Sequence, residues 1–256
     1  MDEEEYTYIK IPYPDARDLH FKITAPISSL VISPGIGIAW ATGRYHDPMF
    51  VAQLAIQQSG SVAEIVAAGA FAYRTPPRLL PDLKLSFGRS KPFSLSISAG
   101  DLPDHLDFGG VPLTSLEVKY GAGSQIVDFS YPNPQEMSRM KFTAESGLVK
   151  IEDAANANAA EIRLNGDATS YRINFGGELK QNTVLHIGMT VSKVDVFISS
   201  GTAVKVTSTN PPLSSSPDDF SRADKAFWNV PAKNHREPLL TINNGASNCP
   251  LSVRVI

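Results

Sequence analysis

Charged side chains recur at similar intervals along the middle of the sequence, each between two hydrophobic residues. The series is Glu117, Lys141, Arg163, His186 and Lys205. If the chain folds into stacked repeats, these side chains lie in one row at the ~4.8 Å spacing of neighbouring strands. Such a mainly basic row could bind an anionic partner such as lipid headgroups, a wall polymer or an acidic protein. The alternative is a solvated face whose charges offset one another, because exposed charges are common and contribute little.

A second series follows at the next strand of each repeat and consists of Asp128, Lys150, Arg172 and Asp195. Carboxylates aligned across repeats could cleave acidic polysaccharides. In this series Asp128 and Asp195 are three repeats apart, which corresponds to ~14 Å at the strand spacing. That separation exceeds the ~5 to 9.5 Å between the two carboxylates of a glycosidase. The series therefore predicts no catalytic pair.

The segment DLPDHLD gathers the ligand types that hold a hard cation or zinc, namely Asp101, Asp104, His105 and Asp107. In a loop, aspartates more often accept hydrogen bonds from nearby backbone amides. We therefore expect turn chemistry here and predict no metal site.

Glycine pairs at 35–37 (GIG) and 121–123 (GAG) resemble the start of a dinucleotide-binding loop. The third glycine of that motif is replaced by Trp40 and Ile126, and no helical pattern follows. The sequence also contains no GxSxG elbow, P-loop or HExxH motif. It therefore predicts no catalytic residue, no cofactor and no enzyme activity.

The composition fits a folded chain of 256 residues with a formal net charge of −3, which argues against a nucleic-acid binder. The single cysteine, Cys249, excludes an internal disulfide and a cysteine-based zinc site, and we expect it to be buried. No apolar run approaches the ~18 residues that span a bilayer, and the start, MDEEEYTYIK, is acidic where a secretory signal is basic. A trimmed membrane protein can begin in the same way.

Pairs of hydrophobic residues recur at similar intervals along the chain. They indicate the strands that would position the two charged series. The first series is Leu116/Val118, Met140/Phe142, Ile162/Leu164, Leu185/Ile187 and Val204/Val206, and the second is Val127/Phe129, Val149/Ile151, Tyr171/Ile173 and Val194/Val196. Glycines 121, 123, 147, 166 and 188 lie between the two series, where a chain that changes direction needs a small residue. Each repeat of ~22 residues is too short for a βαβ unit, which needs ~30.

These repeats predict an all-β fold, a single-stranded right-handed parallel β-helix of about seven coils. Leu116, Val118, Val127 and Phe129 would point inward, and Glu117 and Asp128 outward. A single coil cannot bury enough side chains to stand alone, so stacking is required. The alternative is an antiparallel β sandwich in which each glycine break is a hairpin turn.

The rhythm is looser outside the central repeats. Residues 28–40, 52–68 and 82–98 show the same strand, break, strand layout with less regularity, whereas 69–82 and 208–220 read as proline-rich loops. Residues 221–230 are expected to form one or two helical turns that cap a coil end with Phe227 and Trp228. We therefore expect an N-terminal segment at 1–19 and one β-helix domain at 20–256, interrupted by a loop and end cap at 208–230.

The sequence resembles the toast-rack β-helix domains, a family of adhesin-like bacterial proteins of unknown function. These domains are related to the C-terminal domain of membrane proteins that respond to cell-wall-active antibiotics. The similar stretches are VPLTSLEVKYGAGSQIVDFS (111–130), GLVKIED (147–153), VDVFISSGTAVKV (194–206) and ITAPISSLVISPG (23–35). The resemblance covers roughly residues 20–256 and implies a single-stranded β-helix, an envelope setting and often a membrane anchor. It supplies no catalytic residues.

Taken together, the sequence predicts a non-catalytic β-helix interaction or scaffold domain in envelope stress sensing or adhesion. Its partner would be an envelope protein, a wall polymer or an anionic membrane surface, bound through Lys141, Arg163, His186 and Lys205. Self-association through the coil ends is a further expectation. The alternative function is a carbohydrate-active β-helix enzyme, and the alternative location is the cytoplasm.

Overall fold

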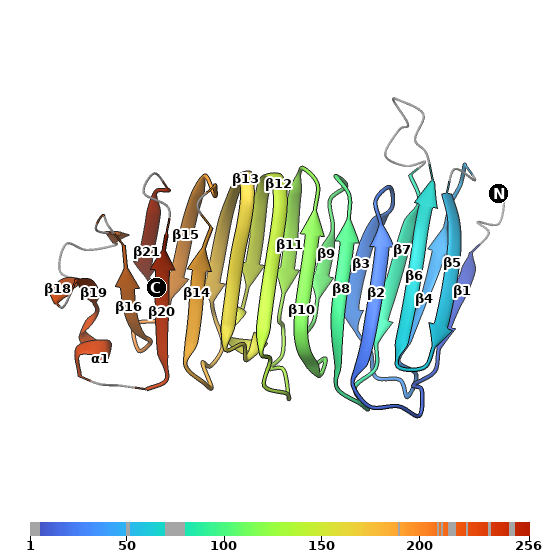
Figure 1. The fold of residues 1–256 in the computed structure, drawn as a ribbon, viewed down its shortest axis with the longest axis horizontal. Coiled ribbons are helices and arrows are strands. Elements are labelled where there is room, and N and C mark those ends of the chain that lie inside the picture. Colours follow the sequence, from blue (N-terminus) through green and yellow to red (C-terminus); the bar gives the residue numbers. More distant parts are fainter. Residues whose placement is uncertain are drawn as a thin grey trace.

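The fold is known from a computed structural model that describes residues 6–49, 52–69, 80–188, 190–208, 210, 212–214, 219–223, 225–234, 237–245 and 249–256. The prediction of an all-β fold is confirmed, because the described elements are strands except for two short helical elements. Every described strand belongs to one large sheet. Most strand pairs in this sheet are parallel, and the strands succeed one another along the longest axis of the molecule (Figure 1).

The strands are β1 (Thr7–Ile11), β2 (Leu19–Ala25), β3 (Ser29–Pro34), β4 (Ala41–His46), β5 (Ala52–Ser59), β6 (Val62–Gly69), β7 (Asp82–Phe87), β8 (Phe93–Ala99), β9 (His105–Asp107), β10 (Leu113–Tyr120), β11 (Ser124–Asp128), β12 (Arg139–Glu152), β13 (Glu161–Phe175), β14 (Thr183–Ile187), β15 (Lys193–Ile198), β16 (Ala203–Thr207), β17 (Leu213–Ser214), β18 (Ser221–Ala223), β19 (Ala226–Trp228), β20 (Leu239–Asn244) and β21 (Leu251–Val255). Two short helical elements accompany them, the 3-10 helix η2 (Ala154–Ala157) and α1 (Val230–Lys233).

The strand pairings divide the sheet into two faces that enclose the core. The order along face 1 is β5, β6, β2, β8, β10, the first half of β12, the first half of β13, β14, β20, β16, β19 and β18. The order along face 2 is β1, β4, β7, β3, β9, β11, the second half of β12, the second half of β13, β15, β21 and β17.

On face 1 the central repeats from β10 to β14 stack in the predicted register. On face 1 the Cα partners run from Leu116 to Met140, then to Ile162 and Leu185. The four residues expected to point inward, Leu116, Val118, Val127 and Phe129, are all buried, whereas Glu117 and Asp128 lie at the surface. Hydrophobic residues at corresponding positions of neighbouring strands therefore fill one continuous core.

The corners between the two faces in the central repeats differ from the predicted strand breaks. β12 and β13 run without interruption through Gly147 and Gly166, so each strand serves both faces. The register skips one residue at the corner, between the pairs Ala144–Gly166 and Ser146–Ala168. Parallel neighbours turn at the same level, and their ladder hydrogen bonds can therefore continue around the bend.

The N-terminal end of the molecule is antiparallel, which corrects the prediction for residues 52–68. β5 and β6 form a hairpin in which Ser59 pairs with Val62, and Gly60 between them has φ +57°. A two-residue link of this kind reverses the chain, whereas a coil corner would carry it forward. β4 also runs antiparallel, between β1 and β7. The hairpin alternative thus applies to this end and to β18–β19, while the central repeats are parallel.

The C-terminal strands do not stack in chain order. β20 lies between β14 and β16 on face 1, and β21 lies between β15 and β17 on face 2. The last two strands of the chain therefore lie between strands that precede them in the sequence. A repeat read along the sequence cannot show this, because it assumes that consecutive repeats are spatial neighbours.

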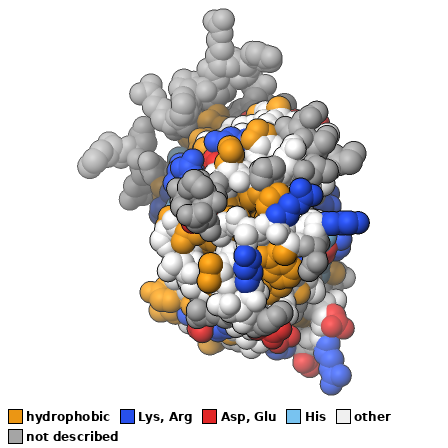
Figure 2. Space-filling view, turned by 90° about the vertical axis from the view of Figure 1, so that its left-hand side faces the viewer, with side chains coloured by type: hydrophobic (Ala, Val, Ile, Leu, Met, Phe, Trp, Pro, Cys, Tyr) orange, Lys and Arg blue, Asp and Glu red, His pale blue; other side chains and the backbone are white. Residues whose placement is uncertain are grey.

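The helical turns expected at 221–230 are wrong for most of that segment. β18 and β19 form a hairpin there, and α1 begins only at Val230, where the Asn229 side chain accepts a hydrogen bond from the Ala232 amide at 3.1 Å. β19 pairs antiparallel with both β16 and β18, and its Phe227 packs against the core. Figure 2 looks onto this end, where lysine and arginine side chains lie among hydrophobic ones.

The predicted loops are only partly covered. Residues 70–79 of the expected loop at 69–82 lie outside the described residues, and the neighbouring Gly69 and Asp82 belong to β6 and β7. Within 208–220 the described residues include the short strand β17. At the N-terminus β1 pairs with β4, and its Ile9 and Ile11 join the core. No helix in the described part of the chain is long and apolar enough to cross a membrane.

Candidate binding surface

The structure brings three of the predicted basic residues together on face 1. Lys141 on β12 is the Cα partner of Arg163 on β13, and Arg163 is the partner of His186 on β14. Neighbouring strands are ~4.8 Å apart, so the three side chains form a straight row. Glu117 on β10 continues the row on the other side of Lys141, as the sequence indicated.

Lys205 does not belong to this row, which corrects the predicted order. The partner of His186 is Asn243 on β20, and Lys205 on the next strand pairs with Thr241. The cause is the insertion of β20 between β14 and β16. Lys205 instead lies with its Nζ 4.8 Å from the ring centre of Trp228, which gives the ammonium an aromatic partner.

Two carboxylates are interleaved with the basic residues. The Glu117 Oε1 atom lies 3.1 Å from the Lys141 Nζ atom and 3.7 Å from the Lys119 Nζ atom. The hydrogen bond from Lys141 lowers the pKa of Glu117, so this carboxylate stays ionised at neutral pH. Part of the row is therefore a self-neutralising surface, as the solvated-face alternative predicted.

Glu161 plays the same role two strands further along, on β13. Its Oε1 atom lies 2.7 Å from an Arg163 Nη atom and 3.4 Å from the His186 Nε2 atom, and the hydrogen bond from Arg163 lowers the pKa of Glu161. Arg139 also lowers the pKa of both carboxylates through its charge. We use the name basic cluster for Lys119, Arg139, Lys141, Arg163 and His186. Four permanent cations face two carboxylates, so the cluster is positive at neutral pH.

On face 2 the second charged series is only partly in register. Lys150, Arg172 and Asp195 are partners on successive strands, as expected. Asp128 instead pairs with Glu152 on one side and with Asp107 on the other. The step from β11 to β12 is 24 residues, the same as the step from Leu116 to Met140 on face 1. That face 1 interval was visible in the sequence and could have given the correct register.

Asp107, Asp128 and Glu152 thus form a row of carboxylates on consecutive strands, which sequence reasoning missed. Burial and the charges of Asp107 and Asp153 raise the pKa of Asp128, and the Asp128 Oδ1 atom is buried without a hydrogen bond. The other two carboxylates are held by neighbours: Asp107 accepts from the Gly109 amide and the Ser130 hydroxyl, and Glu152 accepts from the Asn174 side chain at 3.2 Å. Two of the three carboxylates in this row are therefore held in place by hydrogen bonds within the protein.

The aspartates of the DLPDHLD segment accept hydrogen bonds from backbone amides, as predicted. Most of these amides belong to neighbouring repeats and not to the segment itself. Asp101 Oδ1 accepts from the Ala122 amide at 2.7 Å, and Asp104 Oδ1 accepts from the Leu30 amide at 2.7 Å. His105 is exposed. Within the described ranges, no group of three or more His, Cys, Asp or Glu side chains is placed to hold a metal ion.

Asp104 is buried, and burial raises its pKa to about 7. The pKa of an aspartate in an unfolded chain is about 3.9. Stability associated with this group is therefore complete below pH ~4 and is lost as the pH rises towards 7, because the fold must then hold a buried carboxylate. Asp104→Asn should raise the free energy of unfolding by about 1 to 3 kcal/mol at pH 7.5 and have little effect at pH 4.

Chemical denaturation across this pH range checks the prediction. The control is Asp101→Asn in the same loop, whose carboxylate is exposed and therefore lacks the burial cost that the Asp104 variant relieves. A variant at Asp104 that is less stable than the wild type at pH 7.5 would contradict the prediction.

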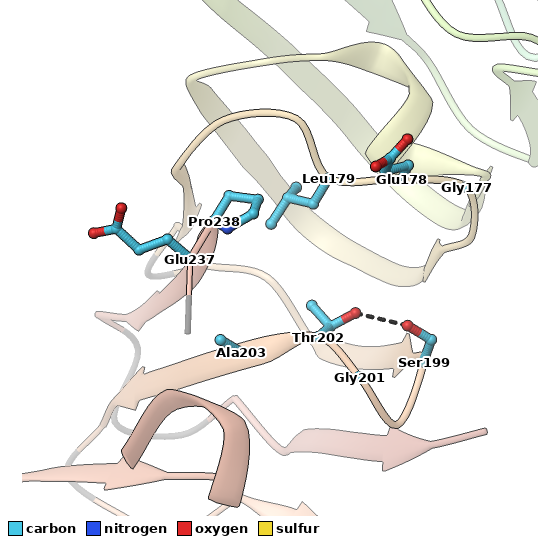
Figure 3. Close-up of a pocket in the computed structure, with 9 residues that line it drawn as sticks. All are labelled: Gly177, Glu178, Leu179, Ser199, Gly201, Thr202, Ala203, Glu237 and Pro238. Atoms are coloured by element: carbon cyan, nitrogen blue, oxygen red, sulfur yellow. Dashed lines mark hydrogen bonds between the residues drawn. The ribbon is translucent and has the colours of Figure 1, made fainter. Parts of the chain in front are cut away.

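A pocket of about 280 Å³ lies near the C-terminal end of the molecule (Figure 3). Glu178 and Glu237 lie on opposite sides of the pocket in this view, and the Ser199 and Thr202 hydroxyls bond to each other at 2.8 Å. These groups do not converge on one point, as an acid, a base and a nucleophile would have to. Cys249 is buried, as expected, and burial raises the pKa of its thiol, which disfavours the reactive thiolate.

No protein-family model and no curated protein matches the sequence, so the resemblance to the toast-rack family is not confirmed. The chain is similar to the crystal structure of a candidate cell adhesion protein from Clostridium sporogenes ATCC 15579, with a TM-score of 0.49 and 10% identity over 99% of this chain and 100% of that one. A candidate adhesin from Bacteroides fragilis NCTC 9343 gives a TM-score of 0.49 and 7% identity over 100% and 98% of the two chains. At these values the similarity carries no argument about function.

Proposed function

We propose that this chain is a non-catalytic interaction module of the adhesion type that binds an anionic polymer or surface of the cell envelope through the basic cluster. Its scaffold would be a single-stranded right-handed parallel β-helix with one domain at residues 20–256 and the segment 1–19 before it. The observation that carries the proposal is the row of Lys141, Arg163 and His186 on three consecutive parallel strands.

The row suits a ligand with repeated negative charges. Ladder hydrogen bonds and a continuous core hold the three strands, so the spacing of the basic groups is fixed before binding. A fixed array of charges loses little entropy when it meets a partner of matching spacing. The side chains are also accessible, because Arg163 and His186 are 48% and 43% exposed.

The two carboxylates in the cluster limit the affinity of any single group. An anion must compete with Glu117 for Lys141 and with Glu161 for Arg163. A multivalent polymer can outweigh this competition because it meets several cations at once. A small monovalent anion cannot, so we infer that the ligand is polymeric or membrane-bound.

The double charge reversal Lys141→Glu with Arg163→Glu tests this proposal. Each cation near an anionic surface contributes about 1 kcal/mol, so the variant should bind about 30-fold more weakly or worse. Binding is measured by co-sedimentation with phosphatidylglycerol vesicles and with isolated wall fragments at low salt. Phosphatidylcholine vesicles serve as the neutral surface.

The matched control is Lys150→Glu with Arg172→Glu. These residues are partners on the same two strands, β12 and β13, but lie on face 2. This control should bind within about twofold of the wild type, since exposed charges on the far face are screened. Equal loss in both variants would show that net charge alone matters, and no loss in either would remove the basic cluster as a binding site.

The competing function is hydrolysis of an acidic polysaccharide, and the carboxylates on consecutive strands favour it. Asp107, Asp128 and Glu152 are partners on neighbouring strands, and the ~4.8 Å strand spacing is similar to the ~5 to 5.5 Å between the two carboxylates of a retaining glycosidase. The hydrogen bonds that hold Asp107 and Glu152 support a structural role instead. Release of reducing ends from an anionic polysaccharide, abolished by Asp128→Asn, would overturn the non-catalytic proposal.

A further inference from the structure

The two ends of the sheet are finished in different ways. At the C-terminal end the outermost described strands are short: β18 has three residues, including Arg222, and β17 has two. α1 follows the hairpin and contacts β16. Short edge strands and edge charges are devices that prevent a sheet from pairing with another chain.

The N-terminal end of face 1 lacks these devices in its described part. β5 is eight residues long, AQLAIQQS, with no charged residue and no proline. Its pairing partner is β6, and no other described strand pairs with it. One row of its backbone N–H and C=O groups therefore faces outward along the sheet direction. A long uncharged edge of this kind is a template for strand addition.

The core is also incompletely covered at this end. Ile56 on β5 is the partner of Ile65 on β6, yet Ile56 is 42% exposed and Ile65 is completely buried. Leu54, two residues earlier on the same side of the strand, is half-buried and packs against the core. A further strand beside β5 would bury these two side chains as well as the edge.

We propose that β5 is a self-association surface: the β5 strands of two copies pair antiparallel across a twofold axis and join the two face 1 sheets into one. An overlap of seven residues, 52–58 of each copy with Ala55 opposite Ala55, would add about eight backbone hydrogen bonds. Because the twofold axis of an antiparallel strand pair is perpendicular to the sheet, the exposed sides of both copies face the same way.

The partner strand belongs to a second copy of this chain, because the edge is uncharged and a twofold axis brings two identical edges together. Twofold pairing closes after two chains and places β5 against itself, and the absence of charge means that no like charges meet. The edge likewise offers no charge to select a partner of opposite sign. If the proposed function is right, the dimer presents two basic clusters on one side, but the pairing itself does not depend on that function.

Sedimentation equilibrium over a range of concentrations, without any ligand, tests the pairing. The wild type should approach twice the 27.7 kDa of the chain as its concentration rises. Ala55→Lys with Gln57→Lys places lysines on the exposed side of β5, where they oppose lysines of the second copy, and should weaken association about tenfold or more. The matched control is Leu213→Lys on β17 at the opposite end, which should leave association unchanged.

A wild type that stays monomeric at every concentration would overturn the proposal, as would a dimer that survives the lysines on β5 or is lost with Leu213→Lys. Thermal melts show whether each variant is folded. Single cysteines at Gln53, Ala55, Gln57 and Ser59 give a test that does not depend on the lysines, since Cys249 is buried. Antiparallel pairing should give a peak of disulfide cross-linking nearest the axis that falls to either side. Equal yields at all four positions, or none, would contradict it.

Discussion

Replacing Gly147 with alanine is expected to destabilise the fold by about 3 kcal/mol or more, through two independent effects. Gly147 has φ +107°, a conformation that other residues rarely adopt. A Cβ atom at this position would also lie 2.0 Å from the carbonyl oxygen of Gly123, which lies in the link between β10 and β11. This neighbour is backbone and cannot move aside without disturbing the ladder on both strands.

Gly60→Ala separates the two effects. Gly60 has φ +57° in the β5–β6 link, but a Cβ atom there meets nothing within 4 Å. This variant should lose only the conformational term, about 1 kcal/mol. Both variants are compared with the wild type by urea denaturation. Equal losses at the two sites would show that the close approach to Gly123 is unimportant.

Phe21→Ala is expected to cost about 3 to 5 kcal/mol of the free energy of unfolding. Phe21 on β2 is completely buried, and its ring lies 5.1 Å from the ring of Trp40 and 5.0 Å from that of Phe87, in edge-to-face contact with both. Phe21 belongs to face 1 and Phe87 to face 2, so this side chain joins the two faces. Its removal would leave a cavity where the parallel coils meet the antiparallel end.

Phe197→Ala is the control for loss of an aromatic ring. Phe197 lies at the surface of β15, where its ring centre is 4.6 Å from the Arg172 guanidinium and 5.8 Å from that of Arg254. Its loss should cost about 1 kcal/mol, because no cavity forms and the cation–π contacts are exposed. Thermal and urea unfolding measure both variants. A loss at Phe21 no larger than that at Phe197 would contradict a joint role in the core.

The central repeats were predictable because their signal is local and repeated. Hydrophobic residues at alternating positions fix which side of each strand is buried, as at Leu116 and Val118. Equal intervals between repeats then place Lys141 beside Arg163 and Arg163 beside His186. Stacking identical layers requires no information beyond the interval, so this part of the candidate site followed from the sequence.

Where the interval changes, the sequence interpretation failed. Asp128 was assigned to the row of Lys150, but a step of 24 residues places it beside Glu152. Because of this error the sequence interpretation missed the row of carboxylates on face 2. It therefore gave less support to a glycosidase than the structure does. A shift by an even number of residues keeps the same side chains buried, and the hydrophobic pattern therefore cannot reveal it.

The sequence by itself determined the all-β class, the inward and outward sides of the central strands and, on face 1, their register from β10 to β14, because these follow from side-chain alternation and a regular interval. Only the tertiary structure decided that β20 separates Lys205 from His186, that β5 turns back on β6, and that Glu117 and Glu161 offset part of the basic cluster. The physical reason is that such contacts join residues far apart in the chain, so the order in which layers are filled is set by the burial of the whole core and leaves no periodic mark on the sequence.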